Sequence, residues 1–439
     1  MSTPTNPSRI SHQYIWRLAI PMIIANIFVP LLGMVDTAMV GHLDTAQYLG
    51  AIALGTLIFT FLFWGFGFLR MATTGLTAQA LGQDDAIASE RILSQGLTLA
   101  LIIATVILLL QQPIAQFAFH YLEGSEQVKQ LARDYFAIRI WSTPAILANY
   151  VAIGWLIGKA QTRSVLAIFL LVNISNIILD VVFVYGLAMD INGVALASVI
   201  AEYIGLIAVL FILKRHQQPL PRFAVAAFFS NQHFLTTLKL QSNIFIRTLI
   251  LISSFAFFTV QGAKQGDITL AANTVLLNFI AFMAFVLDGL ANAIEIITGK
   301  AIGKKDRQQL KNGIVLTAGW SFFVACCFST LYYVFGSNII YLLTDIPAVI
   351  KAANDYLIWL VIAPIIAVWS YFFDGVFIGA TKSKEMRNTM IFASLLCYLP
   401  SFYLLQPMGN HGLWLALLIF LAARGLSQAI YLPAIIRLR

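Results

Sequence analysis

Long apolar stretches separated by short polar segments dominate the sequence. A helix needs about 20 apolar residues to cross the roughly 30 Å hydrocarbon core of a bilayer. The first stretch, residues 18–40, lacks the cleavage site of a signal peptide, so we expect it to remain as a span. By these criteria the pattern predicts twelve membrane-spanning helices, which start near Trp16, Gly50, Ile92, Tyr135, Val165, Asn192, Leu238, Leu270, Gly313, Asn354, Met390 and Gly412.

The stretch from Val165 to Tyr185 carries three strongly polar side chains, Asn173, Asn176 and Asp180, on an otherwise apolar helix. At 100° per residue they fall within about 60° of arc, on one face. A carboxylate at mid-membrane depth costs on the order of 2.5 to 3.5 kcal/mol. Asp180 is therefore expected to face protein or a water-filled cavity. Hydrogen bonding between helices is the alternative role for the stripe.

The first predicted span contains Asp36, the only ionisable residue between Leu18 and Gly41. An acid inside a membrane helix is by default a candidate functional residue. Pro21 and Pro30 precede it, and each removes a backbone donor, so we expect a hinge near this acid. Prolines are also common in membrane helices generally, which is the simpler explanation.

Two halves of the chain repeat at an offset of 221 residues. The segment ending ALGQDD corresponds to the segment ending AIGKKD, and Gly158 in LIGKAQTRS corresponds to Gly379 in FIGATKSKE. Six helices per half predict parallel repeats around an axis along the membrane normal. We expect an N-terminal bundle of residues 1–213, a polar cytoplasmic linker of residues 214–237 and a C-terminal bundle of residues 238–439.

Polar residues inside the spans mark the expected transport path. The first half adds Asn149 and Ser198 to the polar residues already named, and these are predicted to form a supporting network. The second half has Asp288, Glu295 and Asp374, which are candidates for binding a cationic substrate. For four further charged residues we predict ion pairs or charges that reach the membrane surface, and these are Arg70, Arg247, Arg424 and Glu202.

Composition and charge agree with a membrane protein. Of the 439 residues, 60% are hydrophobic and 10% charged, whereas soluble domains carry about 25% charged residues. Most Lys and Arg residues fall in loops on one side, which places both termini in the cytoplasm. The exceptions, assigned to the outer side, are Lys129, Arg133, Arg139, Lys264 and Lys351. No basic stretch is interleaved with aromatic residues, so nucleic acid is not an expected partner despite the net charge of +8.

Enzyme chemistry is not expected. The sequence contains no P-loop, and its only adjacent acidic pair, Asp84 and Asp85, is not part of a DDxxD cluster. The three cysteines lie inside apolar stretches, where they are expected to pack rather than bind metal. A channel is disfavoured because no ring of acids or filter-like loop is visible. We therefore expect a monomeric transporter without cofactor or resident metal ion.

Several motifs resemble those of the multidrug and toxic compound extrusion (MATE) exporters. The opening LAIPMIIANIFVPLLGMVDTAMVGHLDTAQYLGAIALG is similar to theirs, and FLRMATTGLTAQALG, LDGLANAIEIITGKAIG and FDGVFIGATKSKEMRN resemble the DinF-like branch. The resemblance implies an all-α membrane protein with twelve spans in two six-helix bundles, related by pseudo-two-fold symmetry around a V-shaped cavity. It further implies export of lipophilic, mostly cationic compounds from bacteria across the cytoplasmic (inner) membrane.

The resemblance also assigns roles to residues. It implies that the acid at Asp36 is essential, that the fifth-helix pattern falls on Asn176 and Asp180, and that a sixth-helix threonine is replaced by Ser198. Protons are the usual coupling ion of this branch. The sodium-coupled branch is less similar, because helix seven carries Arg247 and no acid.

Two carboxylates facing one poorly solvated cavity cannot both ionise at low cost, which suits a proton carrier. We therefore expect Asp36 and Asp180 to carry protons in exchange for drug. Sodium remains an alternative, since Asp36, Asn176, Asp180 and Ser198 offer the oxygen ligands that a hard cation prefers. A flippase for lipids or lipid-linked precursors is the other alternative.

Overall fold

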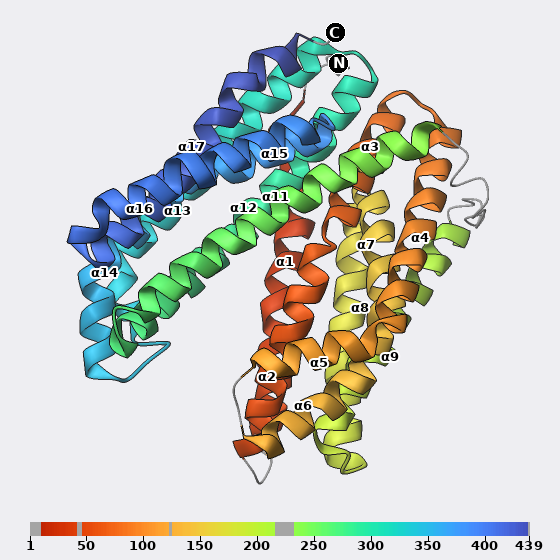
Figure 1. The fold of residues 1–439 in the computed structure, drawn as a ribbon. Helices are drawn as coiled ribbons and strands as arrows, with labels where there is room; N and C mark the ends of the chain where they lie inside the picture. The colour runs from red at the N-terminus through yellow and green to blue at the C-terminus, as the bar shows by residue number, and fades with distance from the viewer. Residues whose placement is uncertain (1–9, 42–45, 123–124, 216–231, 438–439) are drawn as a thin grey trace. The chain divides into compact units, whose positions relative to one another are not determined.

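The computed structural model describes residues 10–41, 46–122, 125–215 and 232–437, and within these ranges it describes the side chains of residues 10–28, 47–122, 125–215 and 237–437. All regular structure in the described residues is helical (Figure 1). The elements up to the polar connector are α1 (His12–Gly41), α2 (Ala46–Gly65), α3 (Phe68–Gly82), α4 (Ala86–Leu109), α5 (Gln111–Tyr121), α6 (Glu126–Arg139), the 3-10 turn η1 (Ile140–Ser142), α7 (Thr143–Gly158), α8 (Thr162–Asp180), the π-helical turn η2 (Val181–Gly186) and α9 (Asp190–Arg215).

The regular structure of the second half is also helical in its described residues. Its elements are α11 (Gln232–Ala263), α12 (Asp267–Gly303), α13 (Arg307–Ile340), α14 (Pro347–Gly379), α15 (Ser383–Ile391), the π-helical segment η3 (Phe392–Tyr398), α16 (Leu399–Leu405), the 3-10 turn η4 (Gln406–Met408) and α17 (Asn410–Ile436).

Membrane-length helices account for most of the described chain. Eleven stretches of helix in these residues are long and apolar enough to cross a membrane. They contain the predicted second to twelfth starts, and α1, with 30 residues, contains the predicted first start. The prediction of an all-α, multi-pass membrane protein is therefore confirmed.

The chain divides into two compact units. Unit 1 comprises residues 1–23, 78–84 and 239–439, and unit 2 comprises residues 24–77 and 85–238. The predicted domains at 1–213, 214–237 and 238–439 stay a prediction, as does the V-shaped cavity. The middle of the predicted linker, residues 216–231, lies outside the described residues.

Each unit has a core built from large apolar side chains. In unit 2, α4 packs against α7, where the buried Trp155 donates from Nε1 to the backbone oxygen and the hydroxyl of Ser89, both at 3.0 Å. In unit 1, the rings of Phe258 on α11 and Trp414 on α17 lie 4.9 Å apart. These apolar side chains are buried where the helices pack against one another. Polar side chains that are buried at the same interfaces need hydrogen-bond partners.

Matching close contacts support the predicted repeat. In unit 2, a Cβ on Gly154 of α7 would overlap the backbone oxygen of Arg70 on α3. In unit 1, a Cβ on Gly375 of α14 would overlap the backbone oxygen of Ala291 on α12. Both members of the second pair lie 221 positions after those of the first. Only glycine allows two helix backbones to approach so closely, so the two halves use the same packing at corresponding positions.

A reciprocal contact joins the end of α3 to the end of α12 within unit 1. A Cβ on Gly82 would overlap the backbone oxygen of Lys300, and a Cβ on Gly303 would overlap that of Gln79. These pairs are again repeat equivalents. Gln79 also donates from Nε2 to the Gly379 backbone oxygen at 2.9 Å. The end of α3 is thus held by backbone contact and by a hydrogen bond to α14.

Replacing Gly303 by leucine is expected to destabilise the protein by about 1 to 3 kcal/mol, because the new side chain must push the two backbones apart. Thermal unfolding in detergent measures the change. The matched control is Gly319→Leu on α13, an exposed glycine with open space around its Cβ position. This control should be neutral or slightly stabilising. Equal stability of the two variants would contradict the close contact.

Candidate functional site

The polar stripe of α8 is buried in unit 2. Asn173, Asn176 and Asp180 are 5%, 1% and 0% exposed, whereas their apolar neighbours Ile174 and Ile178 are more than half exposed. The helix therefore turns its polar face toward the protein. Immediately after Asp180 the backbone changes to a π-helical turn, η2. Such turns are rare and are frequent at functional sites.

Ser198 on α9 links the stripe to a second helix. Its Oγ accepts a hydrogen bond from Asn176 Nδ2 at 3.4 Å and from the guanidinium of Arg139 at 2.6 Å. Arg139 is the last residue of α6. Arg139, Asn176 and Ser198, from α6, α8 and α9, therefore form one polar cluster, and Asp180 lies one helical turn after its member Asn176.

Glu202, one turn after Ser198 on α9, extends the cluster. Asn149 of α7 donates from Nδ2 to Glu202 Oε2 and to the Glu202 backbone oxygen, both at 3.0 Å. Glu202 also interacts electrostatically with Arg139. This partly buried network links α6, α7, α8 and α9, and ionisable residues inside a membrane bundle are functional candidates.

The predicted supporting residues do not all lie in this network. Asn149, Asn176 and Ser198 do, whereas the Nδ2 of Asn173 donates to the Phe169 backbone oxygen of its own helix at 2.6 Å. Their roles in transport stay predictions.

The structure describes the side chain of only one of the three residues predicted to act in α1. Pro21 is buried in α1. The side chains of Asp36 and Pro30 lie outside the described residues, although the helix itself continues to Gly41. The coupling role of Asp36 and the hinge at Pro21 and Pro30 therefore stay predictions.

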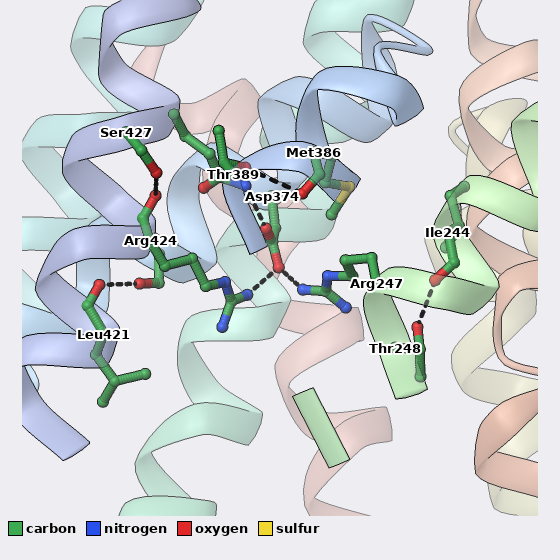
Figure 2. A network of polar contacts seen from close by, with 11 residues as sticks. Ile244, Arg247, Thr248, Asp374, Met386, Thr389, Leu421, Arg424 and Ser427 are labelled. Atoms are coloured by element: carbon green, nitrogen blue, oxygen red, sulfur yellow. Dashed lines mark hydrogen bonds and ion pairs between the residues drawn. The ribbon is translucent and has the colours of Figure 1, made fainter. Parts of the chain in front are cut away.

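The second-half acid Asp374 lies at the centre of a buried ion cluster in unit 1 (Figure 2). Its Oδ2 accepts hydrogen bonds from Arg247 of α11 and Arg424 of α17, and its Oδ1 accepts from Gln428 Nε2 at 2.9 Å. The predicted ion pairs of Arg247 and Arg424 are confirmed. Because both oxygens face protein donors, a cationic substrate would have to compete with two arginines for this carboxylate.

The other two acids of unit 1 lie on α12. Asp288 interacts electrostatically with both Arg247 and Arg424. Glu295 is 3% exposed, two turns further along the same helix. Their contact with substrate stays a prediction. Electrostatically, Asp288 and Asp374 together balance the two arginines.

The charge pattern assigns Arg139 to the outer side of the membrane and gives it no partner, whereas the structure shows its hydrogen bond to Ser198. Its position inside the span predicted from Tyr135 was a signal, because an ionisable residue within a span is a functional candidate. The predicted structural role of Glu202 agrees with its contacts to Asn149 and Arg139. Its spacing of four residues from Ser198 places both on one helix face, which was visible in the sequence.

Comparisons with known proteins agree with this architecture. The MatE family profile matches residues 21–182 and 244–404, one segment in each half of the chain. The chain is 45% identical over 423 residues to the DNA damage-inducible protein F of Escherichia coli, covering 95% of this chain and 91% of that protein. It is 24% identical to the multidrug resistance protein NorM of Vibrio cholerae, covering 94% of each chain.

Solved structures show the same fold. A MOP superfamily transporter from Pyrococcus furiosus aligns with a TM-score of 0.87 at 18% identity, covering 99% of each chain. A multidrug resistance MATE family transporter in an outward-facing conformation aligns with a TM-score of 0.86 at 20% identity, covering 96% of each chain. From the family match, the relatives and the helical fold together, the chain belongs to the MATE family of membrane transporters, in its DinF-like branch.

Proposed function

We propose that this protein exports lipophilic and cationic small molecules across the bacterial cytoplasmic membrane in exchange for protons, with both termini in the cytoplasm. The names of its relatives, which include multidrug resistance proteins, support drug export. The carrying observation is the full burial of Asp180, one helical turn after Asn176, which belongs to the polar network of α6, α8 and α9. A single chain is the proposed functional unit, and the cycle needs no cofactor.

The proposed cycle uses the charge of two carboxyl groups. Asp36 and Asp180 are deprotonated while a drug is bound from the cytoplasmic side. Proton entry from outside removes their charge, and this favours repacking of α1 about Pro21 or Pro30, which releases the drug. Protonation can shift the equilibrium between two conformations only if these hold the proton with different affinity. Asp180, which is fully buried, meets that condition if its surroundings differ between the two conformations.

The energy available is sufficient for useful export. Moving one elementary charge through 100 mV supplies about 2.3 kcal/mol. Since 1.4 kcal/mol is a factor of ten in an equilibrium, such a potential supports a gradient on the order of tens-fold for each net charge that moves per substrate. A pH gradient adds to this.

Drug export can be tested in a bacterial strain that lacks its major efflux pumps. Cells producing the protein are expected to accumulate several-fold less of a lipophilic cationic dye, and to lose this difference when a protonophore collapses the proton gradient. Dye accumulation measured by fluorescence checks both results. The Asp355→Asn variant, which changes an exposed acid on α14, should export like the wild type.

Two other results would contradict proton-coupled drug export, and each would favour a different alternative. Unchanged dye accumulation together with altered exposure of a labelled lipid at the outer leaflet would favour a flippase. Dye export that survives the protonophore but stops without external sodium would favour sodium coupling.

A further inference from the structure

Arg139 is held in a fixed position beside the candidate coupling site. Its guanidinium carbon lies 5.6 Å from the ring centres of both Phe59 on α2 and Tyr135 on α6. Its NH1 donates to Ser198 Oγ at 2.6 Å. Two aromatic faces and one strong hydrogen bond therefore orient this cation. Contacts from α2, α6 and α9 therefore surround this guanidinium group.

The hydroxyl of Ser198 is committed to nitrogen donors. A hydroxyl oxygen has two lone pairs. One faces Arg139 at 2.6 Å, and the other faces Asn176 Nδ2 at 3.4 Å. A metal cation coordinates through the same lone pairs. Ser198, which is one of the four oxygen ligands that a sodium site here would need, would have to give up one of these donors to coordinate a cation.

The positive charge of Arg139 also disfavours a sodium ion at this site. A sodium ion bound to Ser198 Oγ would lie close to the guanidinium, and two like charges at such a distance repel strongly in a poorly solvated site. Glu202, which interacts electrostatically with Arg139, also accepts a hydrogen bond from Asn149 through its Oε2. A proton, in contrast, bonds covalently to one carboxylate oxygen and needs no further ligand.

We propose that Arg139 makes the coupling site of unit 2 selective for protons over sodium, by occupying the Ser198 hydroxyl and by placing a fixed positive charge beside it. The inference rests on the proposed function and names the residue that sets the coupling ion. Arg139 acts through Ser198 and is a specificity-determining residue rather than a proton carrier. The rings of Phe59 and Tyr135 select arginine over lysine, because a planar guanidinium stacks on both.

The test uses purified protein in liposomes, with either a pH gradient in sodium-free buffer or a sodium gradient at equal pH. The wild type should transport dye only with the pH gradient. The Arg139→Gln variant should respond to the sodium gradient with a rate at least about tenfold above that of the wild type. The matched control is Arg133→Gln, an exposed position on the same helix, which should behave like the wild type.

A binding measurement keeps the test decisive if Arg139→Gln transports poorly. Sodium, compared with choline at equal ionic strength, should raise the unfolding temperature of Arg139→Gln but not of the wild type, because a ligand that binds only the folded state stabilises it. Sodium-specific stabilisation of the wild type would overturn the inference, and this arm needs no variant. So would an Arg139→Gln protein that stays insensitive to sodium in both measurements while the wild type is proton-driven. If the wild type does not respond to the pH gradient at all, the proposed function itself fails.

Discussion

The Asp374→Asn protein is expected to be less stable than the wild type by about 3 to 5 kcal/mol, which is the usual cost of removing one partner from a buried ion pair. Arg247 and Arg424 are 4% and 2% exposed, and both donate to the same carboxylate oxygen. Asparagine keeps the shape of the side chain but removes its charge, so two buried guanidinium groups would share only the charge of Asp288. The cluster joins α11, α14 and α17, so its loss weakens the packing of all three.

Thermal or denaturant unfolding of the purified protein in detergent measures this effect. The control is Glu385→Gln, which breaks a surface ion pair with Lys382 at 3.8 Å and should change stability by less than about 0.5 kcal/mol. An Asp374→Asn protein with normal stability but no drug binding would show that Asp374 serves the substrate rather than the fold.

Periodicity predicted the helices and the polar stripe correctly because membrane helices have few ways to satisfy polar groups. The three polar residues of α8 lie on one face at 100° per residue, and that face is buried. The repeat offset of 221 was also readable from short motifs. The matching contacts of Gly154 and Gly375 follow from it, since equal packing requires glycine at equivalent positions.

Partners of long charged side chains were beyond the sequence. Arg247, Asp374 and Arg424 come from three helices, and nothing in their spacing indicates that they meet. The loop-charge pattern assigns Arg139 to the outer side, because that rule counts charges near the ends of spans and Arg139 lies four residues after the predicted start at Tyr135. Only the packing of α6 against α9 brings it to Ser198.

The Asp180→Asn protein is expected to fold like the wild type but to lose proton-driven export by at least about tenfold. Asparagine has nearly the same volume as aspartate and can still form hydrogen bonds, so the packing of α8 against α9 should survive. It cannot gain or lose a proton in the physiological range. Protonation could then no longer bias the two conformations at this position, and only Asp36 would remain to do so.

Dye transport in liposomes under an imposed pH gradient measures this loss, with unfolding temperature as the check on folding. The exposed Asp355→Asn variant is again the matched control and should keep the wild-type rate. Asp180→Asn protein that still concentrates dye against its gradient would assign the coupling elsewhere.

Proton movement driven by the substrate tests the coupling most directly. Wild-type liposomes without a pH gradient and without sodium receive a gradient of a lipophilic cation, and a trapped pH indicator reports proton flux. We expect protons to move opposite to the substrate in the wild type and not in Asp180→Asn. Substrate movement through the wild type with no accompanying proton flux would contradict proton exchange at this site.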